Sequence, residues 1–338
     1  MDFTKILKTS RFLDPAQGFA ETKRYSEVRV DPLTGRTSRI LDFPIKELAR
    51  ADVRAQVENS KAWCPFCPAV VEFVTPKFHP DLLGKERYSR GEALCVPNVF
   101  PYDENGAVCV MTREHYMPLL EFTAGIMEDA LACCFEYLED VVIKQPEMTY
   151  QSVNWNYMPL AGGSLIHPHL QITASSSSTN YYSEMVPALA RYEEKNGRSF
   201  WSDLSDEEQS RSERCISANG RLTWLAAFAP LGVFDILGIL HEAHGPEDIR
   251  DGLLSELVEG LLKILRYIDS LNMGSLNMSL YFLRGDRYFV PHLRICPRVS
   301  IPPFDTSQIN YMKMLHNESL TTLKPEDICS ELKALWHE

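Results

Sequence analysis

The chain contains one order of predicted elements twice, and no other feature of the sequence constrains the fold as strongly. In the first copy, apolar residues on either side of a polar turn at 103–106 predict two strands within residues 94–111. Apolar residues then recur at near-helical spacing over residues 119–142, and a β-rich stretch covers residues 150–173. The first copy therefore predicts strands, a long helix and further strands.

The second copy repeats this order at residues 221–240, 254–268 and 276–295. Both copies end in the sequence Pro-His-Leu, which contains His169 in the first copy and His292 in the second. A histidine before each helix, His115 or His244, precedes that residue by 54 positions in the first copy and by 48 in the second. This near-equal spacing favours duplication. We therefore expect an α+β fold of two repeats, each an antiparallel sheet packed against a long helix.

A polar segment separates the two copies. It opens with four consecutive serines after Ala174 and contains an acidic run at 203–209. Such a composition favours a solvated linker with surface helices. We therefore expect a first repeat at residues 25–175, a linker at 176–219 and a second repeat at 220–338.

Composition and charge narrow the classes of function. Of the 338 residues, 45% are hydrophobic and 24% are charged, which is typical of a globular protein with a large core. The net charge of −12 argues against nucleic acid as a partner, although a local nest of backbone N–H groups can still bind phosphate. No run approaches the ~18 apolar residues of a membrane span, and charges near Met1 argue against a signal peptide. We therefore expect a cytoplasmic protein that binds neither nucleic acid nor a membrane.

Three polar residues at alternate positions end the first copy: His167, His169 and Gln171. Side chains alternate between the two faces of a strand, so these three are predicted to project from one face. A solvent-facing edge strand that carries two histidines by chance would give the same pattern. The glycine pair Gly162-Gly163 upstream and the ligand-type residues elsewhere in this copy favour a functional site.

The sequence Cys64-Pro-Phe-Cys67 has a spacing that allows two thiolates to bind one zinc ion. A tetrahedral zinc site needs two further ligands, and His115 with one histidine of the His-Pro-His sequence could supply them. Two alternatives stay open: a redox-active pair, against which the lack of a βαβ pattern argues, and a pair of buried structural cysteines. The nine cysteines are odd in number and too dilute for a disulfide scaffold, so reduced thiols are expected.

Together, these motifs resemble the galactose-1-phosphate uridylyltransferase family of the histidine-triad superfamily. The resemblance is carried by the sequence Arg29-Val-Asp-Pro-Leu-Thr-Gly35, the two cysteines, Val96-Pro-Asn98, His115, and the stretch from Asn156 to Gln171. It covers residues 25–175 closely and residues 220–335 as a weaker second repeat. The resemblance implies that both repeats are histidine-triad-like units and that the second is degenerate.

The resemblance also implies roles for individual residues. Cys64, Cys67, His115 and His167 match the zinc ligands of the family, and His169 matches its nucleophile. A neutral imidazole is a competent nucleophile towards phosphorus when one ring nitrogen donates to a fixed acceptor, because the other nitrogen then keeps its lone pair. Four protein ligands leave zinc no open position, so the ion would be structural.

The remaining matches surround the substrate. Gln171 matches the glutamine that holds the phosphoryl group, and Asn156 and Ser164 match positions that orient the histidine strand or the phosphate. Backbone N–H groups near Gly162 and Gly163 could add hydrogen-bond donors. Asn98 matches a position that bonds a ribose hydroxyl, beside an apolar wall for the base.

The resemblance implies an enzyme, a nucleotidyltransferase of carbohydrate and in particular galactose metabolism. Attack by His169 on the α-phosphorus of a nucleotide sugar would give a covalent nucleotidyl-histidine. A sugar 1-phosphate or inorganic phosphate would then take the nucleotide, as in a UDP-glucose:hexose-1-phosphate uridylyltransferase. Two alternatives stay open: an adenylyl-transferring phosphorylase that acts on ADP-glucose or dinucleoside polyphosphates, and a non-catalytic, zinc-stabilised nucleotide-binding protein. The oligomeric state, a homodimer included, is also open.

The chain departs from the family at several positions. The family binds phosphate with an arginine about nine residues after the glycine of the Asp-Pro-Leu-Thr-Gly sequence, where this chain has Pro44. Val290 stands where the second repeat would need the first histidine of a His-x-His sequence, so the sequence does not predict a second metal and Glu184 is left outside the site. His292 lacks the neighbours that His169 has, so covalent chemistry is predicted at His169 alone.

Overall fold

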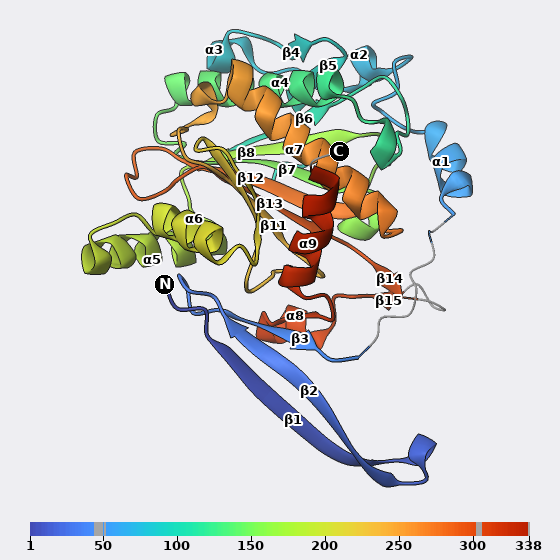
Figure 1. Ribbon diagram of the computed structural model, residues 1–338. Helices are drawn as coiled ribbons and strands as arrows, with labels where there is room; N and C mark the ends of the chain where they lie inside the picture. The colour runs from blue at the N-terminus through green and yellow to red at the C-terminus, as the bar shows by residue number, and fades with distance from the viewer. Residues whose placement is uncertain (44–49, 51, 302–305, 337–338) are drawn as a thin grey trace.

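The computed structural model describes residues 1–43, 50, 52–301 and 306–336. At its centre lies one ten-stranded sheet in which all neighbouring strands run antiparallel (Figure 1). The strands are β4 (Tyr88–Arg90), β5 (Ala93–Pro97), β6 (Asn105–Val110), β7 (Tyr150–Tyr157), β8 (His169–Ser175), β9 (Cys215–Ala218), β10 (Leu222–Ala226), β11 (Ile236–Leu240), β12 (Leu276–Leu283) and β13 (His292–Pro297). The α+β class predicted from the sequence is confirmed.

The sheet consists of two halves with the same strand order. From its outer edge to the centre, the first half runs β4-β5-β6-β8-β7 and the second runs β9-β10-β11-β13-β12. A long helix follows the third strand of each half: α4 (Ala124–Lys144) in the first and α7 (Asp251–Ser270) in the second. The halves meet where β7 pairs with β12. The predicted combination of an antiparallel sheet and a long helix is thus confirmed, and the two sheets are continuous. The residue bounds of the repeats stay a prediction.

Helices α4 and α7 cover one face of this sheet (Figure 1). Thr123 caps α4, its Oγ1 accepting from the Ile126 N–H at 3.3 Å, and apolar residues then recur along one side of each helix. These residues pack on alternate strand residues such as Val153, Trp155 and Leu280 in the main core. Because strand side chains alternate, the residues between them on β7, β8, β12 and β13 face away from the two helices.

The segment at 176–219 contains α5 (Asn180–Asn196), α6 (Phe200–Arg211) and strand β9. Residues of both helices, including Met185 and Trp201, form a second core cluster with Leu225 and Leu237 of the second half. This segment therefore packs against the sheet, and β9 pairs with β10 inside it.

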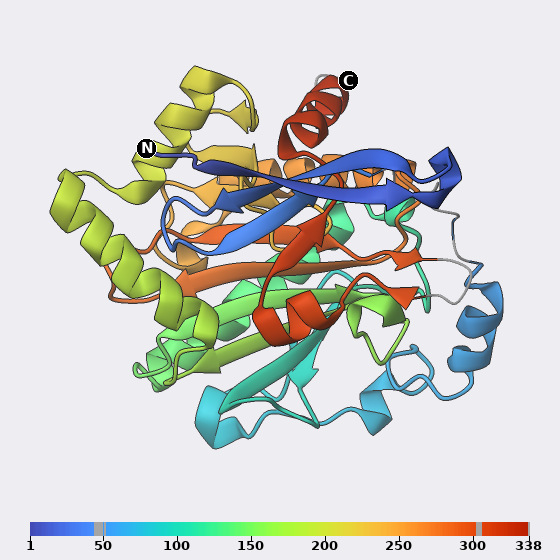
Figure 2. The ribbon, with the colours of Figure 1, turned by 90° about the horizontal axis from the view of Figure 1, so that it is seen from below.

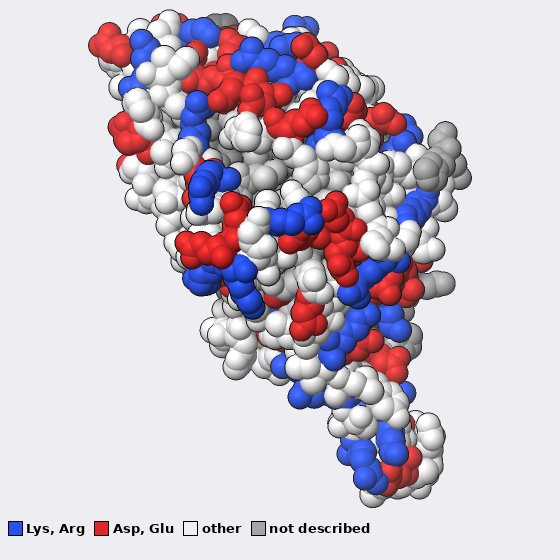
Figure 3. Space-filling view, turned by 60° about the vertical axis from the view of Figure 1, so that its left-hand side comes forward, with Lys and Arg blue, Asp and Glu red and all other residues white. Residues whose placement is uncertain are grey.

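A smaller four-stranded sheet lies on the face away from α4 and α7 (Figure 2). It contains β1 (Lys5–Asp14), β2 (Ala20–Val30), β3 (Thr37–Leu41) and β16 (Ser319–Thr321). The Asp-Pro-Leu-Thr-Gly sequence forms the turn between β2 and β3, because Asp31 Oδ1 accepts from both the N–H and the O–H of Thr34 at 2.8 Å and Gly35 has a φ of 76°. The β1–β2 hairpin projects from the rest of the molecule (Figure 1). On the face of the molecule that Figure 3 shows, acidic and basic side chains are interspersed.

The remaining elements are short. They are α1 (Arg54–Lys61), α2 (Val71–Val74), α3 (Pro80–Leu83), α8 (Tyr311–His316), α9 (Pro325–Trp336), β14 (Ser300–Ile301), β15 (Thr306–Ser307), and four 3₁₀ turns at Pro15–Gln17, Leu119–Glu121, Pro159–Ala161 and Pro246–Asp248. Among the described residues, no helix has the length and apolar character needed to cross a membrane.

Candidate functional site

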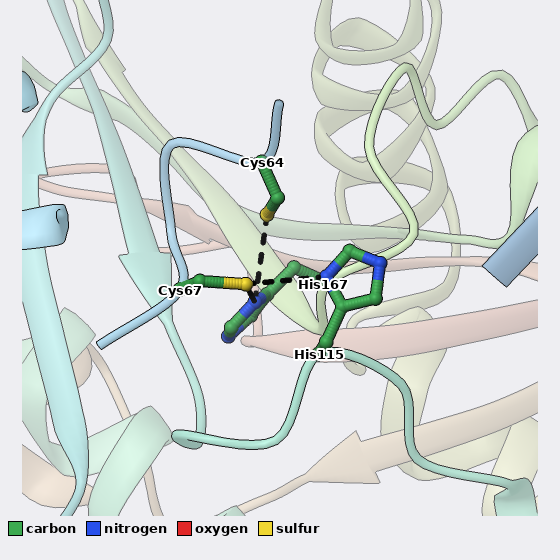
Figure 4. Close-up of side chains that lie close together, drawn as sticks. All are labelled: Cys64, Cys67, His115 and His167. Carbon is green, nitrogen blue, oxygen red and sulfur yellow. Dashed lines mark hydrogen bonds between the residues drawn. The ribbon is translucent and has the colours of Figure 1, made fainter. Parts of the chain in front are cut away.

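The structure brings together the four side chains that the sequence predicted as zinc ligands (Figure 4). The ligand atoms of Cys64, Cys67, His115 and His167 all lie within 4.8 Å of one another. Cys67 Sγ lies 3.4 Å from His115 Nδ1, and His167 Nδ1 lies 3.7 Å from Cys64 Sγ and 3.9 Å from Cys67 Sγ. A tetrahedral zinc ion bound at ~2.3 Å to sulfur and ~2.0 Å to nitrogen would separate its ligand atoms by roughly 3.3–3.8 Å. The cluster could therefore hold a metal ion of this kind.

Hydrogen bonds fix the orientation of both histidine rings. His115 Nε2 lies 2.9 Å from Ser60 Oγ and 3.1 Å from the backbone oxygen of Val57, and His167 Nε2 lies 2.8 Å from the backbone oxygen of Thr112. A carbonyl oxygen can only accept, so Nε2 carries the proton in each ring and Nδ1 keeps its lone pair. Metal-binding histidines usually have such an outer hydrogen bond, so these partners fit the donor set.

Burial sets the protonation of this cluster. It raises the pKa of the Cys64 thiol to about 11 and lowers the pKa of His167 to about 4. The imidazole of His167 is therefore neutral at pH 7, as a ligand must be. A buried thiolate needs a cation to offset the loss of its hydration, so the chemistry of the four donors favours a bound metal ion.

His169 is the first residue of β8 and lies next to this cluster. Its Nδ1 lies 2.7 Å from the backbone oxygen of His167, so Nδ1 carries the proton and Nε2 keeps its lone pair. Phe66 lies between the two cysteines in the sequence, and its ring centroid is 5.4 Å from that of His169 and 6.0 Å from that of His167. Burial lowers the pKa of His169, which keeps the ring neutral. A neutral, oriented imidazole is the form in which histidine attacks phosphorus.

Gln171 lies on the same strand face as His169, as predicted. Leu170 and Ile172 are buried in the main core, so the residues between them face away from it. Gln171 pairs with Asn154 of β7, which is the last pair between β7 and β8, and Asn156 follows two residues later on β7. His167 itself precedes the strand.

The loop between β7 and β8 contains the three other predicted phosphate contacts. Gly162 has a φ of 90°, which favours glycine, and a Cβ on Gly163 would lie 2.8 Å from the backbone oxygen of Asn156. Glycine at 163 therefore lets the loop approach β7 closely. Ser164 is exposed, so its hydroxyl is open to solvent and to a bound molecule.

Asn98 follows β5, two strands away from β8. Its Oδ1 accepts from the Phe100 N–H at 3.0 Å, while its amide nitrogen has no hydrogen-bond partner among the described residues. Val96 of β5 and Val108 of β6 lie in the same cross-strand row as Gln171. The predicted apolar wall therefore lies between Asn98 and the histidine strand.

The second half contributes two residues that the sequence analysis did not single out. Asn277 of β12 donates from Nδ2 to Asn156 Oδ1 at 2.7 Å and accepts from Arg298 Nη1 at 3.2 Å. A signal was present in the sequence, because polar residues alternate over 277–281 as they do over 152–156. Only the pairing of β7 with β12 brings the two patterns onto one face.

Glu184 and Val290 lie outside this cluster. Glu184 Oε2 lies 3.6 Å from Arg36 Nη1. Val290 uses its backbone oxygen to accept from Nδ1 of His292 at 2.8 Å. Pro44 lies outside the described residues.

Comparison with known proteins gives one close sequence relative. No family model matches the chain. An uncharacterized protein of Archaeoglobus fulgidus is 32% identical over 340 residues, which span 100% of both sequences. The chain belongs to the same family as that archaeal protein.

Solved structures identify the fold. An ADP-glucose phosphorylase of Arabidopsis thaliana with bound ADP-glucose aligns with a TM-score of 0.70 and 17% identity, over 91% of this chain and 98% of that one. A uridylyltransferase aligns with a TM-score of 0.66 and 18% identity, over 92% of this chain and 98% of that one. The chain has the galactose-1-phosphate uridylyltransferase fold. A GalT-like protein of Arabidopsis thaliana shares this fold with a TM-score of 0.70, and the resemblance seen in the sequence motifs is thereby confirmed for the fold.

Proposed function

We propose that the protein is a nucleotidyltransferase that moves a nucleoside monophosphate from a nucleotide sugar to a sugar 1-phosphate or inorganic phosphate. The observation that carries this proposal is the orientation of His169. The backbone oxygen of His167 holds the Nδ1 proton, so the lone pair on Nε2 is available to attack phosphorus. The fold adds support, because solved structures that have it include an ADP-glucose phosphorylase and a uridylyltransferase.

The reaction consists of two displacements at one phosphorus. Nε2 of His169 attacks the α-phosphorus of the nucleotide sugar, the bond from phosphorus to the bridging oxygen breaks, and the sugar phosphate leaves with the electron pair. An oxygen of the second phosphate then attacks the same phosphorus, and the phosphorus–nitrogen bond breaks. The electron pair returns to Nε2, while the Nδ1 proton stays bonded to the carbonyl of His167 throughout.

Both displacements build negative charge on the α-phosphoryl oxygens, which requires hydrogen-bond donors already in place. The Gln171 amide shares the strand face of His169, and the exposed Ser164 hydroxyl lies on the adjoining loop. The N–H group of Gly163 completes this set of candidate donors, whereas the Gly162 N–H donates to the backbone oxygen of Pro159 at 2.9 Å. Asn98, at the far side of the apolar wall, would bond a ribose hydroxyl.

The four-residue cluster fits a structural zinc ion, because Cys64, Cys67, His115 and His167 fill a tetrahedral site and leave no open position. When bound, the ion would stabilise the loops around the site. His167 connects the cluster to His169, because its ring supplies a ligand atom while its backbone oxygen holds the His169 ring. We expect about one zinc ion per chain. Elemental analysis of protein purified without chelator would contradict this by finding none.

The nucleobase decides between the two candidate activities. The Asp31–Gly35 turn resembles the uridylyltransferase sequence and favours uridine. An ADP-glucose phosphorylase and a uridylyltransferase both share the fold, so the fold leaves adenosine as the alternative. An apolar wall stacks on either base with little distinction. Calorimetric titration with UMP and with AMP separates the two: we expect uridine, and a clear preference for AMP would assign the protein to the phosphorylases.

Covalent labelling tests the chemistry directly. The protein is incubated with UDP-glucose or ADP-glucose labelled in the α-phosphate, digested and analysed by mass spectrometry. We expect a phosphoramidate, labile in acid and stable in base, on the peptide that contains His169. A protein that binds nucleotides, retains its metal and never becomes labelled would be a zinc-stabilised binding protein, and the proposed transfer would be wrong. A reversible disulfide between Cys64 and Cys67 without zinc would indicate a redox protein.

A further inference from the structure

Arg298 follows β13 in the second half and faces a large cavity. The cavity has a volume of about 890 Å³, and its walls include Tyr157 and Met158 of the first half together with Ser275 and Arg298 of the second. The cavity therefore lies where the two halves of the sheet join, at the end of β7 that leads into the loop with Gly162 and Gly163. His169 and Gln171 do not line this cavity, so the contacts of Arg298 have to connect it to them.

Three neutral groups hold the guanidinium of Arg298. Nη1 donates to Asn277 Oδ1 at 3.2 Å and Nη2 donates to Ser307 Oγ at 3.3 Å. Nε lies 2.6 Å from the side-chain amide of Gln308, oriented so that its oxygen accepts. A guanidinium has five N–H donors, so two remain for a ligand. These three neutral acceptors fix the position of the guanidinium without neutralising its charge.

The charge of Arg298 has no counter-ion among the described residues. The two other arginines of the cavity do: Arg50 Nη2 lies 2.8 Å from Asp269 Oδ2, and Arg54 Nη2 lies 2.6 Å from Asp52 Oδ2. Burial also lowers the pKa of Arg298, which indicates a charge that has lost hydration without gaining an anionic partner. A fixed, partly buried cation of this kind recovers the cost of its burial when it binds an anion.

Hydrogen bonds connect Arg298 to the residues around His169. Asn277 bonds Arg298 through its oxygen and Asn156 through its nitrogen. Asn156 follows Asn154, which pairs with Gln171 of β8. Only β7 lies between β8 and β12, and adjacent strands lie about 4.8 Å apart, so the strand that carries Asn277 lies roughly 10 Å from the strand that carries His169. A phosphate that follows the α-phosphate of a bound nucleotide can span that interval.

We propose that Arg298 binds the phosphate group that leaves in the first displacement and enters in the second, that is, the phosphate of a sugar phosphate or inorganic phosphate. The inference rests on the proposed function and names its acceptor subsite. It also supplies a phosphate-binding arginine in a chain that has Pro44 where the resemblance implies one. Asn277 acts as a positioning residue, because it holds Arg298 and Asn156 in one hydrogen-bonded chain.

The test measures how much a second phosphate adds to nucleotide affinity. Wild-type protein, Arg298→Gln and the matched control Arg50→Gln are titrated with UMP and UDP, and with AMP and ADP. In the wild type, we expect the diphosphate of the preferred base to bind about tenfold more tightly than the monophosphate. Arg298→Gln should remove this gain and keep the monophosphate affinity, and Arg50→Gln should keep the gain.

Several results would overturn the subsite. These are a gain that persists in Arg298→Gln, an equal loss for mono- and diphosphate, or no gain in the wild type. If Arg298→Gln does not fold, Arg298→Lys keeps the charge without the planar fork and should reduce the gain about threefold; an unchanged gain there would contradict the proposal. Labelling of His169 is measured separately. Failure of labelling with an Arg298-dependent gain refutes the transfer reaction, whereas labelling with an Arg298-independent gain refutes the subsite.

Discussion

His169 and His292 occupy equivalent positions in the two halves, and their environments differ in one decisive respect. Both rings are oriented in the same way, because Nδ1 lies 2.7 Å from the backbone oxygen of His167 in the first half and 2.8 Å from that of Val290 in the second. Nε2 of His292 accepts from the Tyr181 hydroxyl at 2.6 Å. Nε2 of His169 has no such partner among the described residues. The fold thus orients both imidazoles, and what covers Nε2 separates them.

Aromatic side chains surround His292 and shield it from solvent. The ring centroids of Trp201, Phe289 and Tyr281 lie 4.5, 5.1 and 5.3 Å from that of His292. His292 is fully buried. The same fold element can therefore present a histidine to a substrate or use it as a core residue, and helices α5 and α6 decide which by supplying Tyr181 and Trp201.

The metal ligands show the same divergence. His115 lies between β6 and α4, and its counterpart region after β11 contains His241 and His244. Nε2 of His241 lies 3.1 Å from Ser205 Oγ and 3.0 Å from Thr223 Oγ1. No pair of cysteines precedes it at the spacing of the first half. The second half therefore lacks the two thiols of the first-half cluster, whereas a hydroxyl contact at Nε2 is common to His241 and His115.

Replacement of each histidine tests the difference between His169 and His292 and has the largest expected effect. We expect His169→Ala to lower the rate of covalent nucleotide labelling at least ~10³-fold, because it removes the nucleophile. His292→Ala should leave that rate within a few-fold, although it should destabilise the protein by leaving a cavity in the second core cluster. Mass spectrometry of the labelled digest gives the site. Label on the peptide that contains His292 would show that the two positions are functionally equivalent.

Removal of a cysteine ligand tests the metal cluster that the second half lacks. Cys64→Ser or Cys67→Ser should abolish tight zinc binding and lower the free energy of unfolding by more than about 4 kcal/mol, since loss of a metal belongs to the largest single-residue effects. Elemental analysis and chemical denaturation measure both quantities. Cys95→Ser, a buried cysteine of the same half outside the cluster, is the control and should retain zinc. Equal metal loss in the control would contradict the assignment.

Tyr181→Phe tests whether the hydrogen bond from the Tyr181 hydroxyl is what prevents His292 from reacting with a nucleotide. The variant leaves Nε2 of His292 buried without a partner, which should cost about 1–3 kcal/mol in the free energy of unfolding. We expect no label on His292, because the aromatic side chains that surround it still exclude a nucleotide. Chemical denaturation and peptide mapping provide the two readouts. New label on the His292 peptide would mean that the hydrogen bond, and not burial, separates the two histidines.

The pH dependence of stability gives the smallest effect when it is expressed per pH unit. Burial lowers the pKa of His292 from its ordinary value of 6.5 to about 3. Between these values the unfolded chain binds a proton that the folded chain does not, so stability is fully present above pH 6.5 and decreases as the pH falls towards 3. His292→Gln should reduce this slope by up to about 1.4 kcal/mol per pH unit. Denaturation at several pH values measures it, and an unchanged slope would show that His292 is protonated in the folded protein.

Much of this molecule could be predicted from local patterns. Apolar spacing placed α4 and α7 and the central strands, because a buried face repeats with the period of the element that carries it. The alternation in β8 predicted that His169 and Gln171 share a face, and the spacing of Cys64 and Cys67 predicted a ligand pair. Each of these inferences depends on residues within a few positions of one another.

The sequence by itself therefore determined the strands and the long helix of each repeat and the donor set of the metal cluster. The tertiary structure decided which faces meet. Pairing of β7 with β12 brings Asn277 and Arg298 to Asn156, and packing of α5 brings Tyr181 onto His292, 111 residues away in the chain. Periodicity records that a side chain faces inward or outward, but not which distant side chain it will meet there, because that depends on long-range strand pairing and helix docking.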